Sequence, residues 1–207
     1  MSYKEKTIND RVLLIRIAGE NDLMYRHQIS DWYKLSSLER GIGIAVRSPE
    51  YLSQRIVNGN AIIAFVDGML AGFCYVEVFS SGEYVSNSGL IVNKEFRGMG
   101  LATLIKEVAF NHARDKNPQA KIFGITTSDI VMNINSNLGY RPVSFYQLTT
   151  DEEFWKGCSS CNNYDILLRN KKKMCLCTAM LAPSKEKDGQ MEGQKAKASS
   201  INETNEQ

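Results

Sequence analysis

The chain has 207 residues and a formal net charge of +2, a length that suits one ordinary domain. Hydrophobic residues make up 43% and charged residues 23% of it, as in a globular protein with a buried core. The small net charge gives no argument for nucleic acid or an anionic membrane as a partner. Without a membrane-spanning apolar stretch or an apolar signal-peptide core in MSYKEKTIND, we expect a cytoplasmic protein with reduced cysteines.

The first part of the chain predicts one strand and two helices. Val12–Ile17 reads as a short apolar strand, and Asp22 to about Leu38 favours a helix. Ser48-Pro49-Glu50 combines an N-cap serine with a first-turn proline, so a second helix should begin there and end at Asn58-Gly59.

Three antiparallel strands should follow. The segments 61–66 and 69–79 are apolar, and Asp67-Gly68 between them is a strong hairpin signal. A third strand is expected over Tyr84–Val92.

The clearest element is an amphipathic helix that begins at Leu101. The elements expected after it are a strand, a helix that Gly139 ends, and two further strands: Ala120–Thr126, Ser128–Leu138, Val143–Leu148 and Met174–Leu181. The order predicts an α/β domain with one central sheet.

The domain is expected to span 1–183, with a cysteine-rich extension at 150–180. From residue 184 to 207 the chain is polar and nearly free of large apolar side chains. Such a segment cannot bury enough surface to offset the entropy of ordering it, so a disordered tail is predicted there.

The stretch Arg97-Gly98-Met99-Gly100-Leu101-Ala102 joins an apolar strand to the amphipathic helix. Two glycines at a helix start expose backbone N–H groups, and the helix dipole adds positive potential, so the junction suits an anion such as a diphosphate. It lacks the lysine and hydroxyl of a P-loop. A plain structural turn is the alternative interpretation.

This stretch matches the R/Q-x-x-G-x-G/A signature of the GNAT N-acetyltransferases, and Leu138-Gly139-Tyr140 resembles the family's L-G-F landmark. The resemblance covers roughly residues 10–150, in element order as well as motif. It implies the GNAT fold, with a central mixed, mostly antiparallel sheet flanked by helices, and acetyl-CoA as co-substrate.

By that resemblance the backbone of the motif would hold the diphosphate of the coenzyme, while the strand before it would pair with the pantetheine arm at a splayed sheet edge. The implied coenzyme-binding residues are Leu90, Ile91, Val92, Arg97, Gly98, Met99, Gly100, Leu101, Ala102 and Asn135.

Direct acyl transfer needs a base for the amine and an acid for the leaving thiolate. Many family members place a tyrosine acid four residues before the L-G-F glycine, but this chain has Asn135 there. Asn135 can donate a hydrogen bond but cannot give up a proton. Tyr140 is a substitute acid or else a packed aromatic residue.

Glu77 is the best candidate for the base, since it lies in the otherwise apolar strand FCYVEVF beside the motif strand. A solvated strand face is the alternative. Asn87 and Ser88 precede the motif strand and are assigned to the substrate side, where they can orient a water. His27 is a weaker base candidate.

Arg40 and Arg47 flank a Gly-Ile-Gly-Ile loop between the first two helices, in the region that covers the acceptor in this family. Their guanidinium groups can bind a carboxylate in a bidentate manner, which favours an acidic acceptor. Two solvated loop charges are the alternative.

Four cysteines lie in the extension: Cys158, Cys161, Cys175 and Cys177. C-x₂-C followed thirteen residues later by C-x-C supplies enough thiolates for a structural zinc site. Cys175 and Cys177 would point to one face of a strand. Buried free thiols and redox chemistry are the alternatives.

The extension, with segments such as AGFCY and NSGLIV, resembles a GNAT subfamily of Bacteroidetes-type bacteria associated with arginine biosynthesis. That resemblance implies an enzyme that moves an acetyl or succinyl group to the amine of glutamate or a related amino acid.

A catalytically silent GNAT domain that senses acyl-CoA or an amino acid is the competing hypothesis, because the tyrosine acid is missing. A peptide acceptor is a second alternative, which the paired arginines disfavour. Neither a nucleic acid nor a membrane is expected as a partner, and a homodimer is compatible with the apolar C-terminal strands.

Overall fold

The structure is a computed structural model that describes residues 3–8, 10–41 and 44–185. The predicted disordered tail lies outside the described residues from 186 on, as do Ile42 and Gly43 of the loop between the arginines. Within the described ranges, no helix is long and apolar enough to cross a bilayer.

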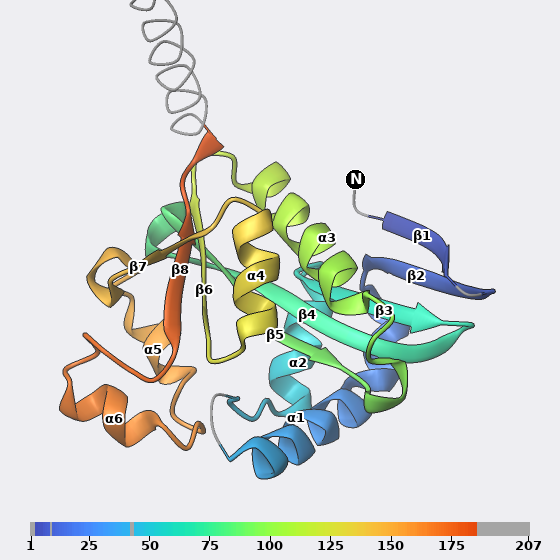
Figure 1. Cartoon of the computed structure of the whole chain (residues 1–207), viewed down its shortest axis with the longest axis horizontal. Helices are drawn as coiled ribbons and strands as arrows, with labels where there is room; N and C mark the ends of the chain where they lie inside the picture. The colour runs from blue at the N-terminus through green and yellow to red at the C-terminus, as the bar shows by residue number, and fades with distance from the viewer. Residues whose placement is uncertain (1–2, 9, 42–43, 186–207) are drawn as a thin grey trace, which may run out of the picture.

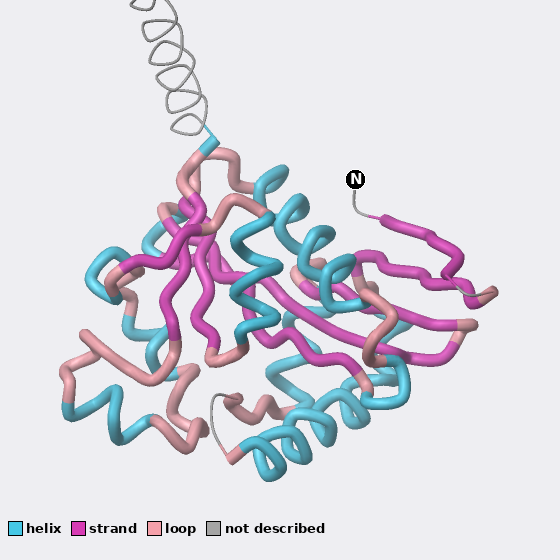
Figure 2. Tube along the Cα trace, in the orientation of Figure 1, coloured by secondary structure: helices cyan, strands magenta, loops and turns pink. Residues whose placement is uncertain are grey.

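Among the described residues, one sheet holds eight strands in the order β1-β2-β3-β4-β5-β6-β8-β7 (Figures 1 and 2). The strands are β1 (Tyr3–Ile8), β2 (Arg11–Ile17), β3 (Ala61–Val66), β4 (Met69–Phe79), β5 (Tyr84–Val92), β6 (Lys121–Thr126), β7 (Arg141–Val143) and β8 (Thr178–Ala182). Neighbouring strands run antiparallel, except that β5 and β6 are parallel. The predicted mixed, mostly antiparallel sheet is confirmed.

Helices cover both faces of this sheet (Figure 1). They are α1 (Arg26–Arg40), α2 (Pro49–Val57), α3 (Leu101–Lys116), α4 (Asp129–Asn137), α5 (Glu152–Lys156) and α6 (Tyr164–Arg169). A core of β-strand residues with Ile105, Val108 and Ala109 lies under α3. A second core, with Ile29, Leu52 and Phe73, lies under α1 and α2 on the opposite face. The sheet therefore has one helix-covered hydrophobic core on each of its two faces.

Local signals placed most element ends correctly. Asp67 and Gly68 both have positive φ, +48° and +78°, as a two-residue hairpin turn of the primed type requires. The Ser48 hydroxyl accepts a hydrogen bond from the Tyr51 N–H at 3.2 Å, which is the predicted N-cap. Gly139 has φ of +89° just after α4, where a C′ glycine belongs.

The C-terminal strands were predicted incorrectly. Val143–Leu148 holds only the end of β7, followed by a 3₁₀ turn over Phe145–Gln147. β8 begins at Thr178, so Cys175 and Cys177 precede the strand and do not share a strand face. A third hydrophobic core, rich in aromatic residues, explains the difference. Phe145, Phe154 and Trp155 pack in it from short helical segments rather than from strands.

The two halves of the sheet separate between β5 and β6. Parallel pairing is limited to Tyr84–Ser86 against Lys121–Phe123, although β5 continues to Val92 and β6 to Thr126. Beyond these three pairs, the strands diverge. The predicted splayed sheet edge is thus present, and it opens between the two strands that lead into α3 and α4.

Candidate active site

A cleft of about 530 Å³ follows this divergence. Its walls come from the α1–α2 connection, from α2, from the diverging ends of β5 and β6, from α4 and from the cysteine-rich extension. Segments far apart in the sequence therefore meet around one space that is large enough for the reactive end of a ligand.

The wall formed by β5 is shaped by Gly89. The strand carries an extra residue here, because Tyr75 pairs with Ser88 while Phe73 pairs with Ile91. Gly89 has φ of +66°, and a Cβ on it would overlap the ring of Tyr75. Its carbonyl accepts a hydrogen bond from the Tyr33 hydroxyl. Only glycine fits this bulge, which directs neighbouring backbone groups of β5 into the cleft.

At the start of α3, the backbone N–H groups of residues 98–102 donate to no acceptor in the described part of the chain. Gly98 and Gly100 have φ of +82° and +76°, and a Cβ at either would meet open space. The two glycines are therefore needed for the conformation of the backbone turn and not for close packing. The exposed Arg97 lies beside them, and its Nε donates to the Val92 carbonyl at 3.3 Å. A free helix N-terminus of this kind attracts an anion.

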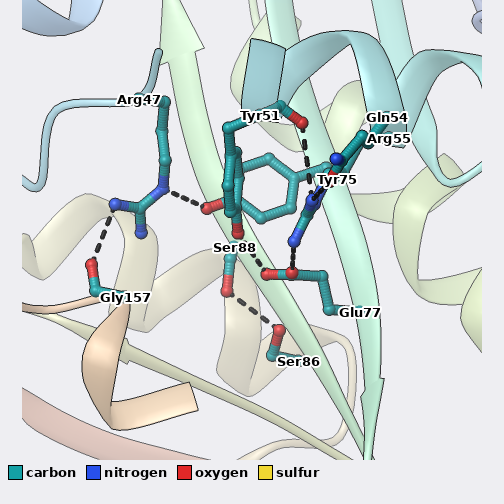
Figure 3. A network of polar contacts seen from close by, with 9 residues as sticks. All are labelled: Arg47, Tyr51, Gln54, Arg55, Tyr75, Glu77, Ser86, Ser88 and Gly157. Atoms are coloured by element: carbon teal, nitrogen blue, oxygen red, sulfur yellow. Dashed lines mark hydrogen bonds and ion pairs between the residues drawn. The ribbon is translucent and has the colours of Figure 1, made fainter. Parts of the chain in front are cut away.

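Glu77 lies on the cleft wall in a polar network that Figure 3 shows from close by. One carboxylate oxygen accepts from the Tyr51 hydroxyl at 2.6 Å, and the other pairs with Arg55. The Glu77 side chain is only 18% exposed, so it does not lie on a solvated face. Each carboxylate oxygen can still accept a second hydrogen bond, for example from an amine.

Arg47 is half-buried between two elements. Its Nε donates to the Tyr75 hydroxyl at 2.7 Å and its Nη1 to the Gly157 carbonyl at 2.9 Å (Figure 3). Burial opposes the charge, but the neighbouring tyrosines outweigh it and the pKa of Arg47 is raised. Among the described residues, no acceptor is bonded to Nη2, so one donor remains for a ligand. Arg40 is exposed at the end of α1 and lines the same cleft.

The inner end of the cleft is polar. The side chains of Asn87 and Asn135 each leave one amide atom without a hydrogen-bond partner among the described residues. Asn87 Oδ1 accepts from the Cys74 thiol at 3.1 Å. Ser88 donates to the Ser86 hydroxyl at 3.1 Å. Buried polar atoms without partners are rare in folded proteins, and they indicate a site where water or a ligand binds.

Tyr140 lies beside this polar end but does not line the cleft. It is 2% exposed and packs on Phe110, with ring centroids 5.4 Å apart. Burial raises its pKa well above the usual range of tyrosine. Its ring packs as in a core, while its hydroxyl, like the amide atoms of Asn87 and Asn135, has no hydrogen-bond partner among the described residues. His27 lies at the start of α1 and is not among the residues that line the cleft.

The four cysteines of the extension line the cleft beside Arg47. Burial raises the pKa of Cys158 to about 11 and that of Cys177 to about 12. Within the described residues, no group of three or more His, Cys, Asp or Glu side chains is arranged to hold a metal ion. The residues present thus do not fit the predicted zinc site, and all four stand as free thiols.

Lys106 is a cleft residue that the sequence interpretation overlooked. It is 2% exposed although the helical stripe predicts only its neighbours as buried. Ala102, Ala109 and Ala113 lie four, three and seven residues away on the same side of α3. A lysine within a column of alanines was the available signal, because small neighbours let such a helix approach the sheet closely.

Solved structures share this fold at low sequence identity. N-acetylglutamate synthase from Neisseria gonorrhoeae, solved with coenzyme A and N-acetyl-glutamate, is 18% identical with a TM-score of 0.60. The match covers 83% of this chain but only 35% of that one. Rv2747 from Mycobacterium tuberculosis, solved with CoA and NLQ, is 17% identical with a TM-score of 0.58, and the match covers 82% and 98% of the two chains.

A phosphinothricin acetyltransferase from Sinorhizobium meliloti, solved with AcCoA, is 14% identical with a TM-score of 0.56 and 90% coverage of both chains. No curated protein matches the chain significantly in sequence. The model of the acetyltransferase (GNAT) family, however, matches residues 25–130, the segment that runs from α1 through the motif and α3 into α4. The chain therefore belongs to the acetyltransferase (GNAT) family.

Proposed function

We propose that the protein is an N-acyltransferase that moves an acetyl group from acetyl-CoA directly to the amine of a small acidic amino acid such as glutamate. The observation that carries the proposal is the cleft itself. It joins the diverging ends of β5 and β6, of which β5 leads to the start of α3, to a pocket whose walls include Glu77 and the arginines Arg40, Arg47 and Arg55. One end suits a nucleotide thioester and the other suits a charged amine.

The coenzyme would occupy the divergence between β5 and β6. Its diphosphate would accept hydrogen bonds from the N–H groups of 98–102, with Arg97 adding a charged donor. Leu90, Ile91 and Val92 would offer their backbone groups to the pantetheine amides, since in the described part of the chain no strand pairs with β5 on that side beyond Ser86. Asn135 would accept a hydrogen bond from a pantetheine amide through its unpartnered Oδ1, because its Nδ2 already donates to the Met180 sulfur at 3.6 Å. Family members bind acetyl-CoA in this way, which supports the assignment.

Glu77 would accept the proton of the substrate ammonium, directly or through a water that Asn87 and Ser88 orient. Tyr51 and Arg55 hold its carboxylate on the cleft wall, so the base is positioned before the substrate arrives. The amine nitrogen then attacks the thioester carbonyl, and the tetrahedral intermediate releases the thiolate of coenzyme A.

Arg40 and the remaining Nη2 donor of Arg47 would bind the carboxylates of the acceptor. Because Nε and Nη1 of Arg47 are already engaged, Arg47 would contribute one hydrogen bond rather than a bidentate pair. The N-acetyl-glutamate in the Neisseria structure and the resemblance to a subfamily associated with arginine biosynthesis both favour glutamate.

The test is release of coenzyme A from acetyl-CoA and succinyl-CoA, each with glutamate, aspartate, ornithine and a lysine peptide. Turnover is expected with an acidic amino acid and should fall in Arg40→Ala. Turnover on the lysine peptide alone would contradict an amino-acid acceptor.

A silent, ligand-sensing domain is the second candidate, since Asn135 replaces the family tyrosine and cannot supply a proton. Tight binding of acetyl-CoA without turnover on any of the four acceptors would favour it.

A further inference from the structure

Lys106 is a buried cation without an anion. Its side chain lines the cleft, yet it is 2% exposed. The ring of Tyr140 lies near it, with its centroid 5.7 Å from Nζ. Among the described residues, no carbonyl or carboxylate accepts a hydrogen bond from Nζ. The next residue, Glu107, pairs with Lys4 of β1 instead. Burying a charge without a counter-ion costs free energy, which indicates a ligand that supplies the negative charge.

The position of Lys106 along α3 indicates which part of the ligand carries this negative charge. α3 begins beside the end of β5 and packs back along it. Lys106 is the sixth residue of α3, so it lies about 7.5 Å along the helix axis from the N-terminus. That distance carries it away from the phosphate end, toward the point where the pairing of β5 with β6 stops at Ser86. A coenzyme that enters at the α3 N-terminus brings its sulfur to this point.

Two other acids touch the walls of the divergence, and both are engaged: the Tyr33 hydroxyl donates to the Gly89 carbonyl and the Cys74 thiol donates to Asn87 Oδ1. The walls themselves consist of residues 87–90 from β5, residues 124–128, Val131, Asn135 and Lys106. Amides, hydroxyls, glycine and aliphatic side chains make up the rest of this set, and none of them gives up a proton near neutral pH. The titratable groups that face Lys106 from neighbouring elements are Cys74 of β4 and Tyr140 after α4. Both are buried and neutral, so neither supplies the missing anion.

We propose that Lys106 is the acid that protonates the thiolate of coenzyme A as it leaves, an inference that rests on the proposed acyl transfer. When the tetrahedral intermediate collapses, the carbon–sulfur bond breaks and its electron pair stays on sulfur. An N–H bond of the Lys106 ammonium breaks, and the proton forms the S–H bond of free coenzyme A. The neutral amine regains a proton from solvent once the product has left. The lysine thus takes the place of the tyrosine that Asn135 replaces.

Burial lowers the pKa of Lys106 to about 8, closer to that of a thiol than an ordinary lysine is. An acid with such a pKa is still protonated at neutral pH and transfers its proton readily.

The first test needs no acceptor. Coenzyme A is bound to the full-length protein, and its thiolate is titrated by ultraviolet absorbance. The ammonium should lower the pKa of the bound thiol by about one unit relative to free coenzyme A. Lys106→Met should abolish that shift, while Lys116→Met, which removes an exposed lysine from the same helix, should keep it. An unshifted thiol pKa in the wild-type complex would overturn the proposal.

The second test is the rate. With the acceptor found in the screen, Lys106→Met should lower kcat by about 100-fold with little change in KM. The wild-type kcat should fall as pH rises through the pKa of Lys106, and this basic limb should be absent in the variant. Lys106→Gln replaces the methionine variant if circular dichroism shows that variant to be unfolded. An unchanged kcat would overturn the acid role.

The two proposals fail in different ways. Failure of the wild-type protein to bind coenzyme A would contradict the acyltransferase proposal. Normal binding and turnover with a thiol pKa that Lys106→Met leaves unchanged would contradict the role of Lys106 alone.

Discussion

Arg47 and Gly157 are joined by a 2.9 Å hydrogen bond across 110 residues of sequence. The bond connects the α1–α2 connection, which belongs to the region matched by the family model, to the extension that lies beyond it. Ser160 adds a second link to the same connection through the Val46 carbonyl at 3.1 Å. The extension therefore forms part of the cleft wall. Substitutions in it should change how the substrate binds.

We expect Arg47 to be a structural residue and Arg40 to be a substrate-binding residue. Arg47→Ala should lower the free energy of unfolding by about 3 kcal/mol, because the Tyr75 hydroxyl and the Gly157 carbonyl lose their partner in a buried site. Arg40→Ala should leave stability unchanged and raise KM for the acidic acceptor by up to about fivefold. Urea titration and steady-state kinetics measure the two effects. Arg169→Ala, on exposed α6, is the control for removal of a surface arginine. Equal stability of the Arg40 and Arg47 variants would contradict the division.

Glu77→Gln should reduce kcat by about 100-fold without loss of coenzyme binding, because an amide cannot accept the proton of the amine. Glu83→Gln is the matched control, since Glu83 forms an exposed pair with Lys121 at 2.8 Å outside the cleft. Stopped-flow assays at saturating acetyl-CoA measure the change. Full activity of Glu77→Gln would exclude it as the base.

Gly100→Glu should abolish binding of coenzyme A, because it places a carboxylate where the diphosphate would lie. Gly68→Glu is a close control: both glycines have positive φ, +76° and +78°, and both have open space around a Cβ. The backbone strain is thus comparable, while only Gly100 lies at the start of α3. Isothermal titration calorimetry compares the two. Loss of binding in both variants would attribute the effect to strain.

Lys106 should also be visible in stability. Its pKa in the folded protein is about 8, below the ordinary value of about 10.4 that it regains on unfolding. Between these values the unfolded chain binds more protons, so stability rises with pH in this window. Lys106→Met should therefore be more stable than the wild type near neutral pH, and the difference should shrink toward about pH 10. A difference that does not change with pH would contradict the lowered pKa.

The thiols of Cys158 and Cys177 should react slowly with iodoacetamide near neutral pH, because their raised pKa values, about 11 and 12, keep them protonated. Mass spectrometry of the alkylated protein locates the modified residues. Native mass spectrometry of the same sample reports bound metal, and about one zinc per chain would revive the four-thiolate site.

Sequence reasoning succeeded where a local rule decides the structure. The Asp67-Gly68 turn, the Ser48 cap and the glycines of the motif each constrain their own backbone, so the strands around them could be placed. It failed where packing across the sheet decides. Phe145 and Trp155 fold into short helical segments because an aromatic core receives them, and no period in the sequence reports that core.

The site divides along the same line. The motif from Arg97 to Ala102 is contiguous, and the sequence alone located it. The partners of Glu77 come from α2, and Lys106 meets Tyr140 only in the folded protein. Such relations depend on distance in space, and one sequence contains no record of them.

The three residue pairs that join β5 to β6 leave two strand edges inside the molecule that no other part of the sheet completes. An edge on the outside of a sheet invites another chain to add a strand. Here both edges line the cleft, where a chain as slender as the proposed pantetheine arm can pair with them. A pantetheine arm paired with these edges would join β5 to β6 beyond the three residue pairs. Binding of the coenzyme should therefore raise the free energy of unfolding of the protein as well as bring in the acyl group.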